Sequence, residues 1–380
     1  MNRLQQLAVF FTILVSSSIV IAPVGLRNSK NSCYINAVLQ VLYHTPPIRE
    51  EVTRTLDQST SLNKGLKSLF CRLDQANSAK SERQSWISAK PDFLRALWQC
   101  LEEDKAAPKI VAGKEGDAHE LLLFLSKKNE MKFLRDSFEI TIEQRVFSVQ
   151  DEEPNNQELK VLSNTTVKNF GHILTIAGHE PSQRSVQAML ADQQEEVDFE
   201  KSPALKVSKI SAAGPILLFQ LMRMTKGNAR DDSLLVQIDP IIVLLGQQYW
   251  LYAMVLARPG HVTAAIESIS DPKTWFHYDD DKVTAIDLSA VLAQELDAYL
   301  LFYVEQEYKT LHWPVAQQIA EVKENSRSDE TKKASASSGS SSCSSSSSSC
   351  SSSEASTSSD SKERERKRKK KATKLRKNKH

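Results

Sequence analysis

The sequence predicts an α+β fold, because segments with helical periodicity come first along the chain and segments with strand periodicity come later. Up to about residue 135, apolar residues recur at the i, i+3, i+4 and i+7 positions of amphipathic helices. Beyond that point, short runs rich in Val, Ile, Leu and Tyr alternate with turn residues. A doubly wound sheet would interleave the two patterns. We therefore expect an α-rich lobe over residues 25–135 and a β-rich lobe over residues 136–305.

Four amphipathic helices are predicted in the α-rich lobe, each from an apolar stripe along one helical face. The stripes run from Ile35 to Leu42, Leu66 to Leu73, Leu94 to Leu101 and Ala118 to Leu125. Pro46 and Pro47 end the first helix, and Pro91 suits the first turn of the third. Asp117 and Glu120 have the spacing of a capping box at the start of the fourth, with Asp in place of Ser or Thr.

Seven strands are predicted in the second half of the chain. They cover residues 216–221, 234–238, 241–245, 249–256, 262–269, 275–278 and 298–304, and a helix over 285–296 separates the last two. Ahead of them, apolar residues between 140 and 149 sit among polar ones, as in an exposed sheet. Residues 150–160 are expected to form a loop or hairpin tip, and the polar stretch 180–205 shows no clear helix or strand pattern.

The N-terminus carries an apolar segment. No charged residue occurs between residues 4 and 26, and residues 7–22 are largely apolar. Three interpretations stay open: a membrane anchor, a cleaved signal peptide, or a buried strand or helix of the folded body. Two basic residues, Arg27 and Lys30, follow the segment, and only one, Arg3, precedes it. If the segment spans a bilayer, this difference favours a cytosolic location for the body of the protein. Residues 1–24 are therefore a hydrophobic segment and a candidate anchor.

The C-terminal residues 320–380 are expected to be disordered. Residues 335–359 are mostly serine and offer no apolar surface to offset the entropy of ordering. Residues 362–380 are dominated by Lys and Arg, so the formal net charge of +2 hides an acidic body, which is a poor candidate for binding nucleic acid. Three roles stay open for the basic tail: a nuclear localisation signal, a segment that binds anionic lipid or nucleic acid, or a segment that only increases solubility.

The cysteines predict neither a disulfide framework nor a metal site. Five occur in the 380 residues, and two of them lie in the serine tract. No Cys-x-x-Cys pair is present, so no zinc site is expected, nor any cofactor. The sparse count is typical of a reducing compartment.

One cysteine has the position of a nucleophile. Cys33 lies where a polar loop meets the first apolar stripe, at a predicted helix start. The free backbone N–H groups and the positive end of the helix dipole favour a thiolate there, and the thiolate is the reactive form. We therefore expect the helix start to activate Cys33.

A nucleophilic cysteine needs a base, and the base needs an orienting acceptor. Among the eight histidines, His261 stands out because it follows Pro259-Gly260 and opens a predicted strand. The antiparallel return of the next strand would bring Asp279 beside it. A histidine and an aspartate at the ends of a hairpin are also common as simple turn residues. From this pattern alone, a catalytic pair and two turn residues therefore both stay open.

Six segments match, in order, the sequence boxes of one known family. The first box, Gly-Leu-x-Asn-x-Gly-Asn-Thr-Cys-Tyr-x-Asn-x-x-Leu-Gln, is matched here by Gly25, Leu26, Asn28, Asn31, Ser32, Cys33, Tyr34, Asn36, Leu39 and Gln40. The other matching segments are residues 115–121, 215–223, 260–262, 275–280 and 298–303. Over about residues 25–304, the chain thus resembles the ubiquitin-specific proteases, the papain-like cysteine peptidases that remove ubiquitin.

The resemblance implies a papain-like catalytic domain over residues 25–305, with an α-rich thumb lobe, a β-rich palm lobe and shortened fingers. Cys33 would attack the carbonyl after the last glycine of ubiquitin, and His261 would act as general base and then as acid. Asp279 would orient His261, with Asp280 as an auxiliary. Asn28 would donate its amide to the oxyanion, beside the backbone N–H of Cys33. The partners would be ubiquitin and ubiquitinated proteins.

Some residues depart from the family pattern. Lys30 stands where the family has Gly, which predicts either backbone strain or a charge that lowers the Cys33 pKa. Val262 replaces an aromatic residue, and the zinc-binding cysteines of the fingers are missing. Two alternatives to an active deubiquitinase therefore stay open. One is a catalytically weak or inactive ubiquitin-binding scaffold, and the other is a membrane-tethered adaptor that acts through its basic tail.

The apolar N-terminus is loosely similar to that of the membrane-anchored mitochondrial outer-membrane member of the family. We therefore expect residues 4–26 to contact a membrane, with the catalytic domain in the cytosol. The cytosol or the nucleus is the alternative location.

Overall fold

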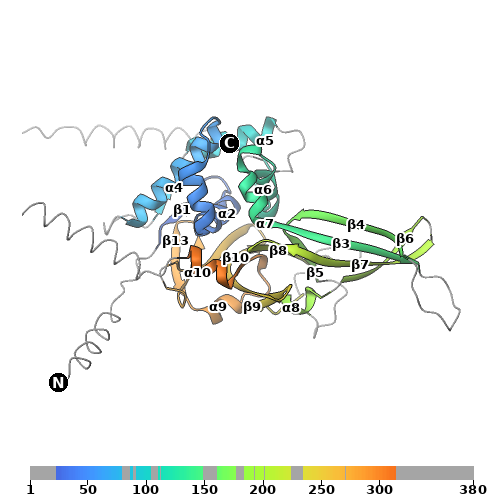
Figure 1. Cartoon of the computed structure of the whole chain (residues 1–380). Helices are drawn as coiled ribbons and strands as arrows, with labels where there is room; N and C mark the ends of the chain where they lie inside the picture. Colours follow the sequence, from blue (N-terminus) through green and yellow to red (C-terminus); the bar gives the residue numbers. More distant parts are fainter. Residues whose placement is uncertain are drawn as a thin grey trace, which may run out of the picture. The chain divides into compact units, whose positions relative to one another are not determined.

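The fold is known from a computed structural model of the chain (Figure 1). The structure describes residues 23–78, 86–88, 91–103, 110–111, 113–148, 161–176, 184–191, 193–200, 202–223, 234–269 and 271–313. Most of the predicted N-terminal segment and all of the predicted tail over 320–380 lie outside these residues. Within the described ranges, no helix has both the length and the apolar character needed to cross a membrane.

The first lobe is helical, and the four predicted helices are confirmed as α2, α4, α5 and α6. Its helices are α2 (Cys33–Tyr43), α3 (Pro46–Glu50), α4 (Ser61–Ser78), α5 (Pro91–Glu103), α6 (Ala118–Ser126) and α7 (Lys132–Phe138), with a π-helical turn at Glu51–Thr55 and a 3-10 turn at Asn129–Met131. The predicted cap of α6 is present, because the Asp117 carboxylate accepts a hydrogen bond from the Glu120 backbone N–H at 2.8 Å.

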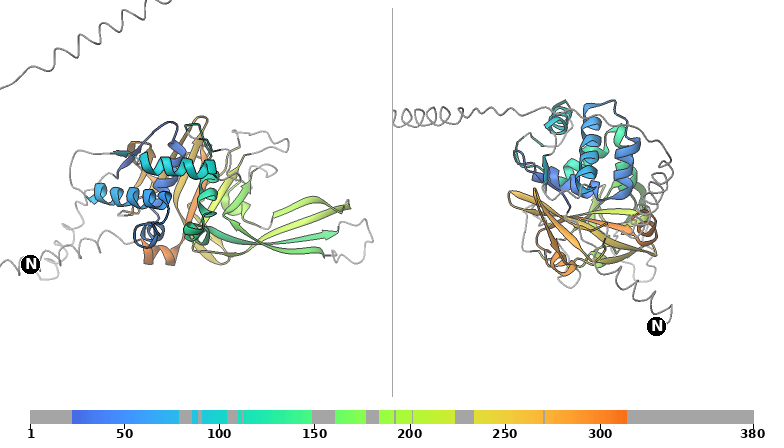
Figure 2. Two further views of the ribbon diagram at one scale, coloured as in Figure 1. Left: turned by 90° about the horizontal axis from the view of Figure 1, so that it is seen from above. Right: turned by 90° about the vertical axis from the view of Figure 1, so that its left-hand side faces the viewer.

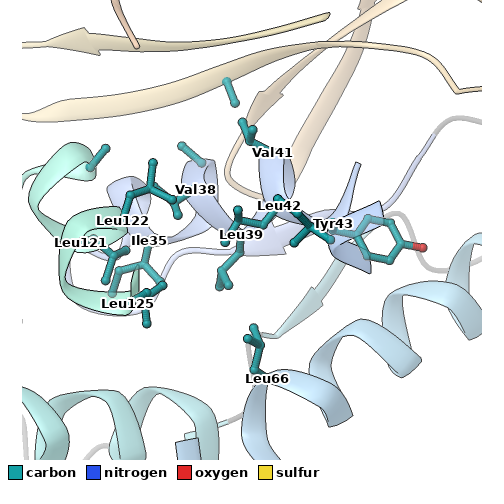
Figure 3. Close-up of a cluster of buried hydrophobic side chains, with 14 of the residues drawn as sticks. Ile35, Val38, Leu39, Val41, Leu42, Tyr43, Leu66, Leu121, Leu122 and Leu125 are labelled. Carbon is teal, nitrogen blue, oxygen red and sulfur yellow. The ribbon is translucent and has the colours of Figure 1, made fainter. Parts of the chain in front are cut away.

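Helix α2 forms the centre of this lobe, and all of its residues are buried. Figure 3 shows its apolar side chains between Leu66 of α4 and Leu121 of α6. Its two polar side chains fix the segment that precedes it: Asn36 donates to the backbone carbonyl of Leu26 at 3.1 Å, and Gln40 donates to that of Val24 at 3.0 Å. The helix therefore carries Cys33 on a rigid, fully packed element.

The second lobe is built on one large sheet. Its strands are β5 (His172–Thr175), β8 (Ile216–Met222), β9 (Ile241–Leu244), β10 (Gln247–Arg258), β11 (His261–Glu267), β12 (Trp275–Asp279), β13 (Lys282–Ile286) and β14 (Ala298–Glu305). They lie in the order β13-β12-β11-β10-β14-β8-β5, and β9 pairs with β10. Only the β5–β8 pair is parallel within this sheet.

The large sheet separates two apolar cores. Alternate residues of β11 enter them, Ala264 and Ile266 on the side of α2 and Ala265 on the other. Figure 2 shows the helices of the first lobe stacked on one face of this sheet. Two short helices, α8 (Val186–Met189) and α9 (Leu288–Leu292), contribute to the second core, and α10 (Gln306–His312) packs on β10 and β14. The helices-then-strands order confirms the predicted α+β class.

A second, four-stranded sheet extends beyond the helical lobe (Figure 1). It contains β3 (Glu139–Ser148), β4 (Val161–Phe170), β6 (Gln193–Phe199) and β7 (Ser202–Ala213), in the order β4-β3-β7-β6. The sequence indicated β3 but not β4, β6 or β7, because polar residues interrupt the period of two that marks a half-buried strand. A two-stranded parallel pair, β1 (Gly25–Arg27) with β2 (Trp86–Ser88), leads into α2.

Two predicted elements are wrong. Residues 234–238 form only an isolated bridge, Ser185 to Gln237, and their alternation arises because Val236 and Ile238 are buried in the second core. The predicted helix over 285–296 is shorter, because residues up to Ile286 belong to β13. Asp287 then caps α9, accepting a hydrogen bond from the Ala290 backbone N–H at 2.8 Å.

Candidate active site

A cavity of about 280 Å³ lies where the two lobes meet. One wall comes from the start of α2 and the start of α6, and the other from the turn between β10 and β11 and from β14. The lining residues are Cys33, Glu115, Gly116, Asp117, Ala118, Ala257, Arg258, Pro259, Gly260, His261, Val262 and Tyr299. The predicted nucleophile and the predicted base thus face one space.

Cys33 is the first residue of α2 and is 4% exposed. Burial raises the pKa of its thiol, and the nearby charge of Asp280 raises it further. The backbone N–H groups of Val262, Tyr34 and Cys33 itself lower the pKa, as expected at a helix start, but burial outweighs them. The expectation that the helix start favours the thiolate is therefore wrong in direction, because burial outweighs the backbone N–H groups and raises the pKa of the thiol.

His261 and Asp279 are hydrogen-bonded, with 2.7 Å between Nε2 and Oδ1. The antiparallel register of β11 and β12 produces this pair, because Ala264 lies opposite Tyr278 and the two chain ends therefore converge. Since Nε2 contacts the carboxylate, Nδ1 is the ring nitrogen left for the sulfur. Cys33, His261 and the neighbouring Val262 line the same cavity, and the backbone N–H of Val262 lowers the pKa of the Cys33 thiol.

The other two candidate residues bind each other. Asn28 donates from Nδ2 to Oδ2 of Asp280 at 2.8 Å, and Asn36 donates from Nδ2 to Oδ1 of Asp280 at 2.8 Å. Asp280 was expected to assist His261, but both of its oxygens instead receive amides from the Cys33 segment. Asn28 does not line the cavity directly; it lies in the loop that leads to Cys33.

One cluster of metal-ligand atoms occurs in the described part of the chain, at His261, Asp279 and Asp280, whose atoms lie within 4.8 Å of one another. The hydrogen bonds above already use the Asp279 oxygen that faces His261 and both Asp280 oxygens. Because these atoms are matched to N–H donors, the cluster is explained by hydrogen bonding and gives no reason to place a metal there.

The loop before Cys33 contains backbone strain. Lys30 has a φ of 56° and Asn31 a φ of 59°, both in the left-handed region. The sequence predicted this strain as one outcome of a Lys at the family's Gly position. The other outcome finds no support, because Lys30 is not among the groups that shift the Cys33 pKa.

Replacing Lys30 by Gly should therefore stabilise the protein. Left-handed backbone costs a non-glycine residue about 1–2 kcal/mol, and the extra freedom of Gly in the unfolded chain returns roughly half of that. We expect a gain of about 0.5–1 kcal/mol in the free energy of unfolding, measured by urea denaturation. Lys30→Ala, which keeps the strain, is the matched control; an equal gain in both variants would contradict the assignment.

One polar network in the cavity wall was not predicted as part of the site. The hydroxyl of Tyr299 donates to Oδ2 of Asp117 at 2.6 Å and accepts from Nε2 of Gln220 at 2.8 Å. Asp117 thereby joins the cap of α6 to the first residues of β14. Both Asp117 and Tyr299 lie in segments that resemble family boxes, so the boxes were the available signal.

A second unpredicted feature is a close contact within the wall that α2 and α6 form. Gly116 approaches the ring of Tyr34 so closely that a Cβ at this position would lie 2.5 Å from the ring. Gly116 therefore makes room for Tyr34, the aromatic residue that follows Cys33. Any larger side chain would have to displace that ring.

The fold brings a thiol at the start of a buried helix and a histidine–aspartate pair into one cleft. A family model described as ubiquitin carboxyl-terminal hydrolase matches residues 24–303. The chain therefore belongs to that family, which confirms the resemblance found in the sequence.

Two curated relatives share about a quarter of the aligned residues with this chain. Ubiquitin carboxyl-terminal hydrolase 17-like protein C of Mus musculus is 24% identical over 321 residues, which cover 74% of this chain and 54% of the relative. The 17-like protein 13 of Homo sapiens is 25% identical over 317 residues, covering 74% of this chain and 56% of the relative. The chain thus spans about half the length of these curated relatives.

A solved structure has the same fold. It is a DUB module of Ubp8, Sgf11, Sus1 and Sgf73 bound to monoubiquitin, with a TM-score of 0.56 and 17% identity. The match covers 79% of this chain and 74% of that chain. At this identity, the comparison shows the shared fold and no more.

Proposed function

We propose that the protein is a cysteine-dependent deubiquitinase that hydrolyses the isopeptide or peptide bond after the C-terminal glycine of ubiquitin. The observation that carries the proposal is the cavity shared by Cys33 and His261, with His261 hydrogen-bonded through Nε2 to Asp279. Membership of the ubiquitin carboxyl-terminal hydrolase family supports ubiquitin as the modifier.

In the first half of the reaction, the thiol of Cys33 gives its proton to Nδ1 of His261. The sulfur then attacks the carbonyl carbon of the terminal glycine, and the carbonyl oxygen becomes an oxyanion. The backbone N–H of Cys33 and the amide of Asn28 stabilise that charge. When the carbon–nitrogen bond breaks, His261 returns the proton to the departing amine, and a thioester to Cys33 remains.

In the second half, a water molecule gives a proton to His261, and its oxygen attacks the thioester carbon. The carbon–sulfur bond breaks, ubiquitin leaves with a free carboxylate, and the sulfur recovers its proton from His261. Asp279 stabilises the imidazolium in both halves and keeps the ring oriented. Because burial raises the pKa of Cys33, little thiolate forms at neutral pH without help, and the reaction depends on His261 to remove the thiol proton.

A fluorogenic ubiquitin substrate tests this proposal. We expect the wild-type protein to release the fluorophore and Cys33→Ala to be inactive, since alanine offers no nucleophile. Parallel substrates built on ubiquitin-like modifiers test whether ubiquitin is preferred. Equal release by wild type and Cys33→Ala would contradict a thiol mechanism. Ubiquitin binding without release would favour the inactive scaffold, which Lys30 and Val262 suggest.

A further inference from the structure

The end of helix α2 that lies away from Cys33 is joined to the large sheet by two buried hydrogen bonds. His44, the residue that follows the helix, contacts the hydroxyl of Tyr278 on β12 through Nε2, at 2.9 Å. Thr45, the next residue, contacts the hydroxyl of Tyr252 on β10 through Oγ1, at 3.0 Å. All four side chains are buried. The helix that carries the nucleophile is therefore tied to two different strands at its far end.

The hydrogen bond between His44 and Tyr278 has a defined direction. Nδ1 of His44 lies 2.8 Å from the backbone carbonyl of Gln40, and a carbonyl only accepts, so Nδ1 carries the ring hydrogen. Burial lowers the pKa of His44 to about 4, which keeps the ring neutral at neutral pH. Because a neutral ring has one N–H, Nε2 is the acceptor and the Tyr278 hydroxyl donates to it.

This contact lies beside the acid that orients the candidate base. Tyr278 is followed directly by Asp279, whose carboxylate lies 2.7 Å from Nε2 of His261. Tyr278 pairs with Ala264 of β11 on one side and with Val283 of β13 on the other, and its side chain belongs to the core that α2 shares with the sheet. A shift of Tyr278 relative to α2 would therefore move Asp279 with it.

We propose that His44 is a positioning residue that acts through Tyr278 on the catalytic base. By holding the Tyr278 hydroxyl, it fixes the end of β12, and Asp279 then keeps His261 in place. The inference deepens the proposed function and rests on it. Cys33 opens α2 and His44 directly follows it, so one rigid element supports both the nucleophile and its base. Such alignment matters because a misplacement of about 1 Å can lower turnover about 100-fold.

Removing the hydroxyl alone is the most selective test. In Tyr278→Phe the ring keeps its packing, but Nε2 of His44 loses its donor. We expect kcat on fluorogenic ubiquitin to fall about 10-fold. KM should stay within about twofold, because Tyr278 is buried and does not line the cavity. The rate of Cys33 alkylation by iodoacetamide, followed by mass spectrometry, should also fall, since it depends on His261 to remove the thiol proton.

The matched control is Tyr252→Phe, which removes the other buried hydroxyl at the end of α2. Tyr252 lies about 20 Å along β10 from Arg258, the last residue of that strand. We expect this variant to lower the free energy of unfolding as much as Tyr278→Phe does, but to leave kcat and alkylation unchanged. A role in stability alone would treat the two tyrosines alike, so the difference in kcat identifies positioning.

Variants of His44 separate the hydrogen bond from the volume of the ring. His44→Gln can place an amide oxygen near the position of Nε2 and accept from Tyr278, so we expect kcat within about threefold of wild type. His44→Phe keeps the volume but offers no acceptor, and it should match Tyr278→Phe in kcat. Combining these two substitutions should add little, since they remove one interaction. If thermal melting finds His44→Phe unfolded, Tyr278→Phe, which lacks only one oxygen atom, carries the test.

Three results would overturn the proposal. An unchanged kcat in folded Tyr278→Phe would show that the bond to His44 has no role in turnover. An equal loss of kcat in Tyr252→Phe would show that any loosening of the end of α2 has this effect. A loss of kcat with unchanged alkylation would place the defect outside the pair of Cys33 and His261. Failure of the proposed function is distinct, because wild type would then release no fluorophore while alkylation still compares the variants.

Discussion

Replacing His261 by Gln should lower kcat/KM on fluorogenic ubiquitin by about 10³-fold or more, the scale of loss when a triad base is removed. The physical reason is the state of the sulfur. Burial raises the pKa of the Cys33 thiol, so without a base almost no thiolate exists at pH 7. Glutamine keeps much of the volume of the ring and can still contact Asp279, but it cannot accept and return the proton.

The pH profile provides a sharper form of this prediction. In His261→Gln, residual turnover should keep rising beyond the pH at which an ordinary thiol is ionised, because only hydroxide remains to remove the proton of Cys33. His312, an exposed residue at the end of helix α10, provides the control, and His312→Gln should match wild type. Wild-type turnover at pH 7 in a folded His261→Gln variant would contradict the assigned base.

Replacing Lys309 by Met should lower the free energy of unfolding by about 2–4 kcal/mol. Lys309 of α10 forms an ion pair with Glu267 of β11 at 2.5 Å, and their side chains are only 15% and 7% exposed. Burial raises the pKa of Glu267 even though Lys309 lowers it. Without the lysine, the carboxyl group must either stay charged in an apolar setting or take up a proton.

A second substitution distinguishes lost pairing from lost packing. Lys309 also lies over the ring of Trp250, 5.6 Å from its centre, and Met retains most of that contact. Adding Glu267→Gln to Lys309→Met should therefore recover about half of the loss, because the stranded charge is gone. Urea unfolding measures all three proteins. A loss below about 0.5 kcal/mol in Lys309→Met would contradict the account of this pair.

The parts of the fold that the sequence predicted are those set by local pattern. The stripe from Ile35 to Leu42 repeats within two turns, so α2 and its cysteine could be placed without the rest of the chain. The hairpin that joins His261 to Asp279 spans only a short segment, and turn residues mark its bend. By contrast, β6 lies in the polar stretch 180–205, and in β7 the spacing from Leu205 and Val207 to Ile210 breaks the alternation, so neither strand could be recognised from its pattern.

The unpredicted parts of the site depend on contacts between distant segments. Asn28 and Asn36 lie 252 and 244 residues from Asp280, and no local spacing relates them. The predicted direction of the Cys33 pKa shift was wrong for the same reason. The sequence shows the helix start, which lowers the pKa, but the burial that raises it arises only when the two lobes assemble. The family boxes identified the residues but not which acid contacts which partner.

The most direct test of a working thiol in a ubiquitin cleft is a ubiquitin probe with an electrophile at its C-terminus. We predict a single covalent adduct, located at Cys33 by peptide mass spectrometry, with much slower formation in His261→Gln. An unlabelled Cys33 in folded wild-type protein, under conditions that label an established deubiquitinase, would contradict the account.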